Sequence, residues 1–239
     1  MSYSEWANFW KDQKQSFHAV MRVSTTFFAE RIEKLSLIKR SDTLLDYGCG
    51  PGFLADYFSN KGVSITGADI NTSFIEQGKK NHPDSSFVLI TTNSTENEKI
   101  LKDTITDKRF NVIILLSIAQ YYENENELEK TIRLLLPYLR ESGKIIIADI
   151  INEKTSSLQD ALSIFILCVR KRKVISFIKF IFYLLFSNYS DVSKKAKLLT
   201  VSEQSIRQIA AGLFLDYEKV DGLTPHPTRT NYILKKVLK

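Results

Sequence analysis

The sequence is poor in cysteine, and its two cysteines form no recognisable structural motif. Cys49 and Cys168 are far apart in the 239 residues and make no Cys-x-x-Cys pair. This scarcity argues against a disulfide framework and against a cysteine-based zinc site. A chain without disulfides suits a reducing compartment, so we expect a cytoplasmic protein.

The sequence also lacks an uninterrupted apolar run of membrane-spanning length. Its first thirteen residues, MSYSEWANFWKDQ, contain no basic segment followed by an apolar one, so we expect no signal peptide. The most apolar stretch, residues 161–186, is interrupted by the basic cluster Arg170–Lys173 and by Lys179. A bilayer-spanning helix would not tolerate that cluster at its centre, so we expect no transmembrane segment.

Apolar runs of strand length alternate with helical stretches between residues 43 and 150. We predict strands at Thr43–Tyr47, Ser64–Ile70, Ser86–Thr91, Asn111–Ser117 and Lys144–Ile150, and helices at Phe53–Asn60, Ser73–Lys80 and Glu127–Arg140. The polar stretch 93–108 fits neither pattern clearly. Alternating strands and helices imply a parallel sheet, and the unbroken apolar run at 112–116 indicates a sheet covered on both faces.

The flanking segments follow other patterns. Helical spacing of apolar residues predicts helices at 4–13 and 17–38, one or two helices within 155–188, and a helix at 202–211 that Ser202 caps. Two closing strands are predicted at 215–220 and 232–237, joined by a turn that contains Pro225 and Pro227. No internal repeat and no Pro- or Ser-rich linker divides the chain.

A glycine-rich turn follows the first predicted strand and opens the next helix. Asp46 precedes Gly48, Gly50 and Gly52, which alternate with other residues, and Asp69 ends the second predicted strand about 20 residues on. Glycines at such a turn let the backbone approach a ligand closely. An acid at the end of the next strand is placed to accept hydrogen bonds from a ribose.

Two cofactors could suit such a turn. Dinucleotide sites use a Gly-x-Gly-x-x-Gly spacing, with the helix N-terminus facing a pyrophosphate. Here the spacing is Gly-x-Gly-x-Gly, and the carboxylate of Asp46 would repel a pyrophosphate but attract a cation. The turn therefore disfavours NAD.

The segment Leu44–Gly52, LLDYGCGPG, resembles the first motif of the class I S-adenosylmethionine-dependent methyltransferases. Asp69 resembles the acid of the second motif, which holds the ribose hydroxyls in that family. The likeness implies an α/β, Rossmann-like, doubly wound and mostly parallel sheet of seven strands. Their order would be 3-2-1-4-5-7-6, with strand 7 antiparallel.

The resemblance divides the chain into four parts of a single domain over residues 1–239. These are an N-terminal helical lid (1–40), a cofactor-binding core (41–150), a helical substrate-side insertion after strand 5 (151–200), and a C-terminal helix with closing strands (201–239). The cofactor implied is S-adenosylmethionine. The residues expected to bind it are Asp46, Tyr47, Gly48, Cys49, Gly50, Gly52, Asp69, Ile70, Asn93, Ser94, Ser117 and Ile118. The family often has an acid near the adenine at this point after strand 3, whereas this sequence has Asn93.

The sequence does not identify one residue as the catalytic base. Methyl transfer mainly requires that the acceptor be held in line with the methyl group, and a base helps when the acceptor is a hydroxyl or a protonated amine. The candidates are His18 on the predicted lid, His226 between the last two strands, and Tyr121 after strand 4. Tyr122 and Asp149, at the ends of strands 4 and 5, are expected to shape the pocket. His82 is expected to be a surface residue.

The insertion carries the whole basic excess of the chain. Residues 151–200 contain nine Lys or Arg and three Asp or Glu, and this excess of six equals the net charge of +6. The same segment has too many apolar residues for a simple amphipathic helix. It is expected to line an apolar pocket or to meet a partner such as an anionic membrane surface, a carrier protein or a second copy in a homodimer. The alternative without a binding role is a solvated helix end.

Three hypotheses follow from these patterns. The first is methyl transfer to an oxygen or nitrogen of a hydrophobic or lipid-like small molecule, as in a biosynthetic enzyme. The second is an RNA or protein methyltransferase that docks through the basic segment, although nucleic acid is disfavoured because stacking aromatics do not interleave with the basic residues. The third is a cofactor-binding scaffold without catalysis. No metal is expected. The chain also lacks the Asn/Asp-Pro-Pro-Tyr and Pro-Cys motifs that serve adenine, amide or cytosine methylation.

Overall fold

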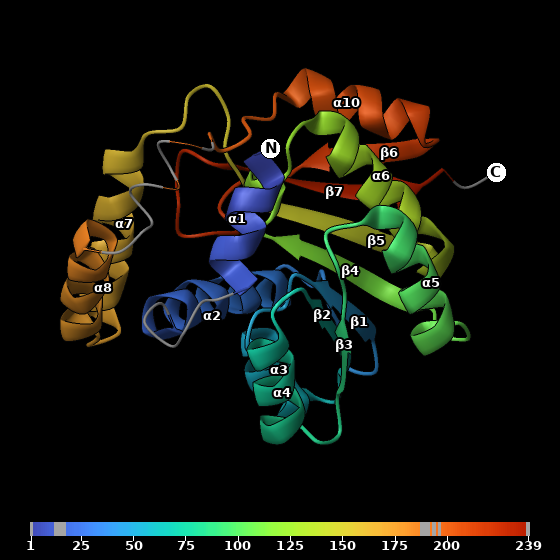
Figure 1. The fold of residues 1–239 in the computed structure, drawn as a ribbon, viewed down its shortest axis with the longest axis horizontal. Coiled ribbons are helices and arrows are strands. Elements are labelled where there is room, and N and C mark those ends of the chain that lie inside the picture. Colours follow the sequence, from blue (N-terminus) through green and yellow to red (C-terminus); the bar gives the residue numbers. More distant parts are fainter. Residues whose placement is uncertain (1, 12–17, 187–191, 193–194, 196, 238–239) are drawn as a thin grey trace.

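A seven-stranded sheet forms the centre of the protein (Figure 1). The computed structural model describes residues 2–11, 18–186, 192, 195 and 197–237. The strand order is β3-β2-β1-β4-β5-β7-β6, and β7 runs antiparallel to β5 and β6 while the other neighbouring pairs are parallel. This order confirms the predicted one. The strands are β1 (Thr43–Tyr47), β2 (Ser64–Asp69), β3 (Ser86–Leu89), β4 (Phe110–Leu116), β5 (Leu139–Ile150), β6 (Leu215–Lys219) and β7 (Thr230–Lys236).

Helices cover both faces of the sheet. One face packs against α2 (His18–Lys34), α3 (Phe53–Phe58) and α4 (Thr72–Asn81). The other packs against α5 (Ser94–Ile105), α6 (Glu125–Leu135) and α10 (Glu203–Gly212). The apolar strands supply both layers, because successive side chains of a strand point to opposite faces. Thus Leu44 and Val112 belong to the first core, and Leu45 and Ile113 to the second.

Several helices begin at side chains that cap their free N–H groups. In each case the side-chain oxygen accepts a hydrogen bond from a backbone N–H in the first turn, which stabilises the helix start. The capping residues are Asn71, Asn93, Asn124, Ser156 and Ser202. The cap predicted at Ser202 is therefore confirmed, since its hydroxyl accepts from the Ser205 N–H.

Two segments differ from the sequence-based expectation. The unsettled stretch 93–108 contains α5, whose buried side chains Asn97, Leu101 and Ile105 lie four residues apart. Because one of these buried residues is an asparagine, the apolar spacing that indicates a helix is incomplete in the sequence. The predicted helix Glu127–Arg140 is too long, because a short 3-10 helix with Pro137 follows α6 and β5 already begins at Leu139. Proline has no N–H to continue an α-helix, so the chain leaves the helix there.

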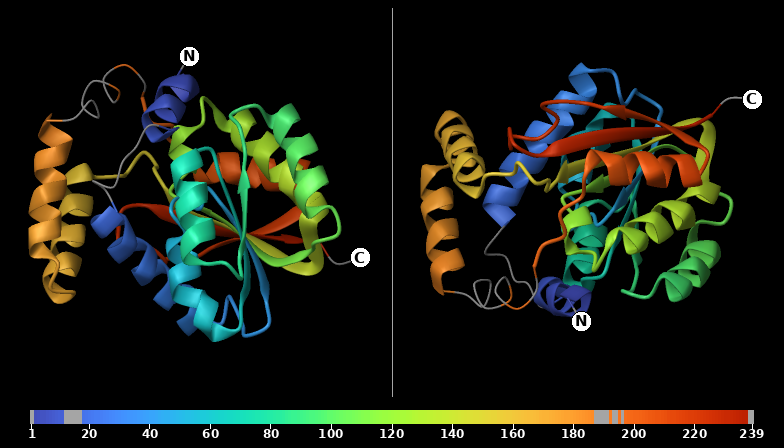
Figure 2. Two further views of the ribbon diagram at one scale, coloured as in Figure 1. Left: turned by 60° about the horizontal axis from the view of Figure 1, so that its bottom comes forward. Right: turned by 90° about the horizontal axis from the view of Figure 1, so that it is seen from above.

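Three further helices surround the carboxyl ends of the strands (Figure 2). Helix α1 (Ser2–Lys11) lies near Ala119–Tyr121, the 3-10 turn that follows β4. Helices α7 (Ser157–Arg170) and α8 (Val174–Phe186) lie side by side and both contact α2. Within the described ranges, no helix combines the length and the apolar character needed to cross a bilayer.

Candidate active site

The turn from β1 to α3 depends on glycine. Gly48, Gly50 and Gly52 have φ values of 85°, 53° and 90°, in the left-handed region that side chains disfavour. Space is also limiting at Gly48, where a Cβ atom would lie 2.5 Å from Cγ2 of Ile118. At Gly50, by contrast, the nearest atom to such a Cβ is Cε of Met21 at 3.8 Å. The turn therefore presents bare backbone to the space beside it.

A cavity of about 870 Å³ lies at the carboxyl ends of β1, β4 and β5. Ligand pockets in proteins span roughly 300–1,000 Å³, so this cavity lies in the upper part of that range. The surrounding helices contribute mainly apolar side chains to its wall. These include Trp6, Trp10, Met21, Ile164, Phe177 and Phe180.

Two buried aspartates lie beside the glycine turn. The backbone N–H groups of Gly50 and Asn71 donate to the two carboxyl oxygens of Asp69, at 2.8 and 2.9 Å. Within the described part of the chain, no hydrogen bond reaches the carboxyl group of Asp46. Burial, and then the neighbouring Asp69, raise the pKa of Asp46 to about 8. Burial raises the pKa of Asp69 as well, although its backbone hydrogen bonds oppose that shift. This end of the cavity therefore favours a cationic ligand, which would restore the ionised carboxylates.

A third buried carboxyl group, that of Asp149, lies at the end of β5. Its oxygens accept from Nδ1 of His226 at 2.6 Å, from Nη1 of Arg229 at 2.8 Å and from the Ser117 hydroxyl at 2.6 Å. Burial acts to raise the pKa of Asp149, but His226 and Arg229 outweigh it and lower the pKa to about 2. Asp149 is therefore a carboxylate at neutral pH.

The backbone at this position is held in an uncommon conformation. Asp149 has a φ of 69° and Ser117, its hydroxyl donor, a φ of 56°. Residues other than glycine occupy this region at a cost and only where the surroundings fix them. Here the Asp149 N–H donates to Oδ1 of Asn231 on β7 at 3.0 Å, and the Ser117 N–H donates to the Ala148 carbonyl. The strained backbone points both side chains toward each other.

The hydrogen bond to Asp149 fixes the role of each nitrogen of His226. If Nδ1 carries the proton that it donates to the carboxylate, Nε2 carries a lone pair. His226 lines the same cavity as Asp46, Gly48 and Gly50. Since β4 lies between β1 and β5, one strand separates the glycine turn after β1 from Asp149 at the end of β5.

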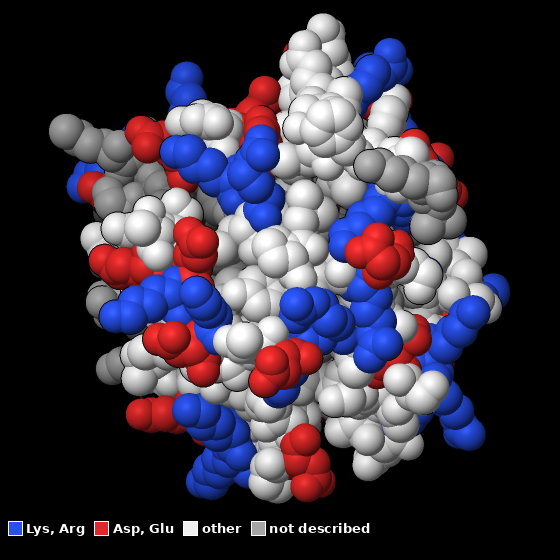
Figure 3. Space-filling view, turned by 90° about the vertical axis from the view of Figure 1, so that its right-hand side faces the viewer, with Lys and Arg blue, Asp and Glu red and all other residues white. Residues whose placement is uncertain are grey.

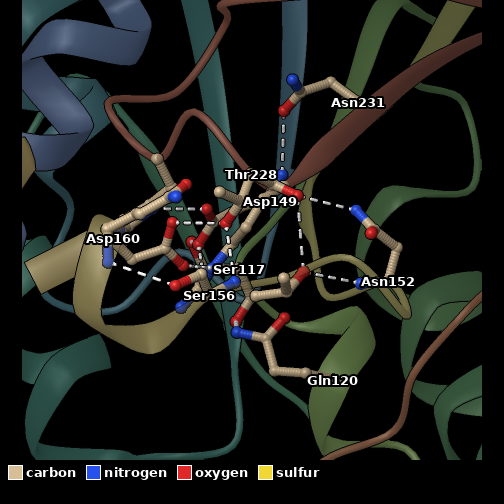
Figure 4. Close-up of polar contacts among 12 residues, drawn as sticks. Ser117, Gln120, Asp149, Asn152, Ser156, Asp160, Thr228 and Asn231 are labelled. Carbon is tan, nitrogen blue, oxygen red and sulfur yellow. Dashed lines mark hydrogen bonds and ion pairs between the residues drawn. The ribbon is translucent and has the colours of Figure 1, made fainter.

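Arg229 joins this group to the insertion. Its Nη1 binds Asp149, while its Nε binds Oδ2 of Asp160 on α7 at 2.8 Å. Asp160 also accepts from the Thr228 hydroxyl at 2.8 Å, and the Thr228 carbonyl accepts from Nδ2 of Asn152 at 2.8 Å (Figure 4). The loop before β7 is thereby tied both to the end of β5 and to the start of α7.

Aromatic side chains close the cavity over β4. The rings of Trp6 and Trp10 on α1 lie 5.3 and 5.4 Å from the ring of Tyr121, centre to centre. All three line the cavity. The Trp6 side chain is buried, so α1 is also held in place by this contact. The contact that both tryptophans share with Tyr121 means that they form part of the cavity wall as well.

The structure brings most of the predicted site residues to one cavity. Those that line it are Asp46, Tyr47, Gly48, Cys49, Gly50, Asp69, Ile70, Ser117, Ile118, Tyr121 and His226. Four predicted residues do not line it. Gly52 caps α3, Asn93 and Ser94 begin α5, and His18 packs against the rings of Phe53 and Phe74.

Sequence reasoning missed several polar residues of this group. Arg229 and Asp160 lie 69 residues apart and meet only through the fold. The surface position expected for His82 is wrong, because its side chain is only 10% exposed and bonds to Asp56 at 2.8 Å. The position of Arg229 could have identified it as a site residue. It lies in the loop 225–229, opposite the end of β5, and sheets of this kind bind ligands at that edge.

Comparison with known proteins agrees with this geometry. A sequence profile described as "Methyltransferase domain" matches residues 18–179. A relative is the ubiquinone biosynthesis O-methyltransferase of Coxiella burnetii (strain Dugway 5J108-111), 26% identical over 122 residues. That match covers 49% of this chain and 49% of the relative, so the chain spans about half the length of the curated relatives it matches.

Solved structures share the fold at low identity. A TehB-like S-adenosylmethionine-dependent methyltransferase from Corynebacterium glutamicum is 14% identical, with 88% of each chain covered and a TM-score of 0.55. Magnesium protoporphyrin IX methyltransferase from Synechocystis PCC 6803, with bound S-adenosylhomocysteine, is 14% identical, with 97% of this chain and 91% of that one covered and a TM-score of 0.51. The chain therefore belongs to the methyltransferase-domain family and has the fold of class I S-adenosylmethionine-dependent methyltransferases.

Proposed function

We propose that this protein transfers a methyl group from S-adenosylmethionine to a hydroxyl oxygen of a hydrophobic small molecule, with His226 as the general base. One observation carries the proposal. A histidine held by a buried carboxylate lines the same cavity as the glycine turn, on the far side of β4. This pairing separates a cation-binding end from a proton-accepting end.

The glycine end suits the cofactor. Gly48 and Gly50 leave room for a ligand beside the backbone, and a cationic ligand there would lower the raised pKa values of Asp46 and Asp69 and restore their negative charge. In this proposal Asp69 holds the ribose hydroxyls, and Asp46 faces the positively charged methionyl part. When bound, S-adenosylmethionine supplies a methyl group on a sulfonium sulfur. The neutral thioether that remains after transfer is a good leaving group.

The histidine end suits an oxygen acceptor. Nε2 of His226 takes the proton of the acceptor hydroxyl, which makes the oxygen a better nucleophile. The resulting imidazolium is stabilised by the Asp149 carboxylate at 2.6 Å. Arg229 and Ser117 keep that carboxylate ionised and oriented.

The wall of the cavity supports an apolar acceptor. The insertion contributes Ile164, Phe177, Phe180 and Ile181 to it, so the inner residues of the insertion face the cavity. This arrangement fits a small molecule better than an RNA or protein substrate. The Coxiella relative is an O-methyltransferase, which agrees with an oxygen acceptor.

The cofactor part is tested by calorimetric titration with S-adenosylhomocysteine, with NADH as the control. We expect micromolar binding of the first and none of the second. Asp69→Asn should weaken the binding because it removes one ribose acceptor. Binding of neither ligand would mean that the cofactor site is degenerate or needs a partner to form, and would contradict this part of the proposal.

The base is tested with labelled S-adenosylmethionine and a panel of alkylated phenols and long-chain alcohols. His226→Gln should lower the transfer rate roughly 10²–10⁴-fold, the usual contribution of a general base, with unchanged binding of S-adenosylhomocysteine. His18→Gln is the matched control, because His18 does not line the cavity. Equal losses in both variants would contradict the role of His226.

A further inference from the structure

The outer side of the α7–α8 hairpin is unusually apolar. The side chains that α7 packs against α2 are those of Ile164, Leu167 and Cys168. The opposite side of α7 exposes apolar residues that recur every three or four positions, and α8 does the same. The exposed ones are Leu158, Leu162, Ile166 and Val169 on α7 and Ile175 and Ile178 on α8.

The two helices that carry these side chains pack against each other. The ring of Phe165 on α7 lies 5.3 Å from the ring of Phe177 on α8, whose side chain lines the cavity. The hairpin therefore carries its exposed apolar residues on two neighbouring helices. Leu158 and Ile175 are 80% and 72% exposed, and water meets apolar side chains along much of the hairpin. Exposed apolar side chains gathered on one pair of helices mark an interaction site.

A basic cluster stands at one end of this surface. Arg170, Lys171, Arg172 and Lys173 form the turn of the hairpin, and Lys179 lies on α8. Lys171 pairs with Glu30, but among the described residues Arg170, Arg172, Lys173 and Lys179 form no ion pair. The sequence has no Asp or Glu between Asp160 and Asp191. The hairpin thus joins exposed apolar side chains to uncompensated positive charge.

We propose that the α7–α8 hairpin docks the protein on an anionic lipid bilayer. The apolar rows enter the boundary between headgroups and acyl chains, and the basic turn binds the anionic headgroups. This mode needs no membrane-spanning helix, and none is found in the described ranges. The proposal goes beyond the methyl-transfer function and does not depend on the identity of the acceptor.

The charge pattern favours a bilayer over a second copy of the chain. A second hairpin would bring like charges together, whereas anionic lipids complement them. The opposite side of the molecule gives a contrast, since positive and negative side chains are interspersed over it (Figure 3). Lys236 on β7, for example, pairs with Glu141 at 2.9 Å.

The inner side of the same hairpin lines the cavity. Ile164, Phe177 and Phe180 contribute to the cavity wall, on the other side of the helices from the exposed rows. A hairpin docked on a bilayer would therefore place the cavity close to the lipid. An apolar acceptor dissolved in the membrane would have a short path to it.

The test is flotation of the full chain with vesicles of phosphatidylcholine alone or mixed with phosphatidylglycerol. We expect binding to the mixed vesicles that weakens as salt rises. Leu162→Glu/Ile166→Glu and, separately, Arg170→Glu/Lys173→Glu should each weaken binding at least about tenfold, as expected for basic residues near a charged surface. All four positions are exposed, so the fold should survive, and melting curves check this.

Two control variants make the same changes elsewhere. Phe214→Glu replaces an apolar side chain that is 84% exposed near β6, and Lys99→Glu/Lys102→Glu reverses two exposed lysines on α5. Both should bind vesicles as the wild type does. Equal losses in the control and hairpin variants would overturn the proposal. So would a lack of vesicle binding together with a dimer that Leu162→Glu/Ile166→Glu dissociates. Because no cofactor enters the assay, its result is separate from that of the methyl-transfer test.

Discussion

Asp46 and Asp149 are both buried carboxyl groups at the ends of parallel strands, yet their surroundings act on them in opposite directions. Asp149 has three side-chain donors, two of them basic, and its pKa falls to about 2. Asp46 has no hydrogen bond within the described residues and faces another acid, so its pKa rises to about 8. Burial is the same in both cases, and the partners decide the charge. A buried acid that the protein satisfies has a structural and positioning task, whereas one that it leaves unsatisfied suits a ligand of opposite charge.

The substitution Asp149→Asn tests the difference between the two acids most directly. The change leaves Arg229 with one acidic partner and His226 without a carboxylate. Loss of one member of a buried ion pair costs about 3–5 kcal/mol of unfolding free energy. We also expect methyl transfer to fall roughly 10²–10⁴-fold, because His226 would lose its support as a base. Chemical denaturation measures the first effect, and a labelled-methyl assay measures the second.

The control for this variant is Asp216→Asn on β6, an exposed acid outside the site. It should change neither quantity noticeably. A normal transfer rate in Asp149→Asn would mean that His226 does not act with this carboxylate. The acid sensitivity gives an independent check. Since the pKa of Asp149 is lowered to about 2, the stability it contributes should be lost as pH falls from about 4 to about 2.

Asp46→Asn should act in the opposite direction on stability. The raised pKa means that the folded state keeps a proton that the unfolded state loses above pH 4. Stability of the ligand-free protein should therefore fall as pH rises from about 4 to about 8, and the variant should lack part of this fall. At pH 8 we expect Asp46→Asn to be more stable than the wild type. Denaturation curves at several pH values measure this.

The same variant should bind the cofactor less well. A hydrogen bond to a charged group contributes about 1.5–3 kcal/mol, so its loss weakens binding of S-adenosylmethionine tenfold or more. Greater stability together with weaker binding is the signature of a site kept for a ligand. A variant that is destabilised at pH 8, or that binds the cofactor normally, would place the cationic ligand elsewhere.

The two aspartates also show how far the sequence predicts the site. The glycine turn and Asp69 lie in one local pattern, strand, turn and helix, so their place at the cavity follows from sequence order alone. The sheet order follows from the resemblance that this turn carries. Asp149 was predicted only as a residue that shapes the pocket, because nothing near it in sequence names its partners. His226 and Arg229 come from a loop 77 and 80 residues away, and only the antiparallel pairing of β5 with β7 brings them together.

The adenine contacts show a second limit. Asn93 and Ser94 follow β3, where the family often has an acid, and the sequence offers them as candidates for that reason. In the structure Asn93 caps α5 by accepting from the N–H groups of Thr95 and Glu96. An asparagine is as good a helix cap as it is a ligand contact, and sequence alone does not separate the two uses. Position in the family pattern therefore predicts the strand ends better than it predicts individual side chains.

Asp160→Asn should have the smallest effect of the three substitutions. Arg229 would keep its bond to Asp149, and the Thr228 hydroxyl could still donate to the remaining amide oxygen. The new amide NH₂ group would replace the oxygen that accepts from Nε of Arg229, at a cost of about 1–3 kcal/mol in unfolding free energy. Binding of S-adenosylhomocysteine should not change, because Asp160 lies on the insertion. Methyl transfer should fall less than tenfold, since α7 is loosened while the pair of His226 and Asp149 remains.

Asp103→Asn on α5 is the exposed control. If Asp160→Asn lost as much activity as Asp149→Asn, the insertion and the strand end would act as one unit, and the role assigned to Asp149 alone would have to be shared between the two acids.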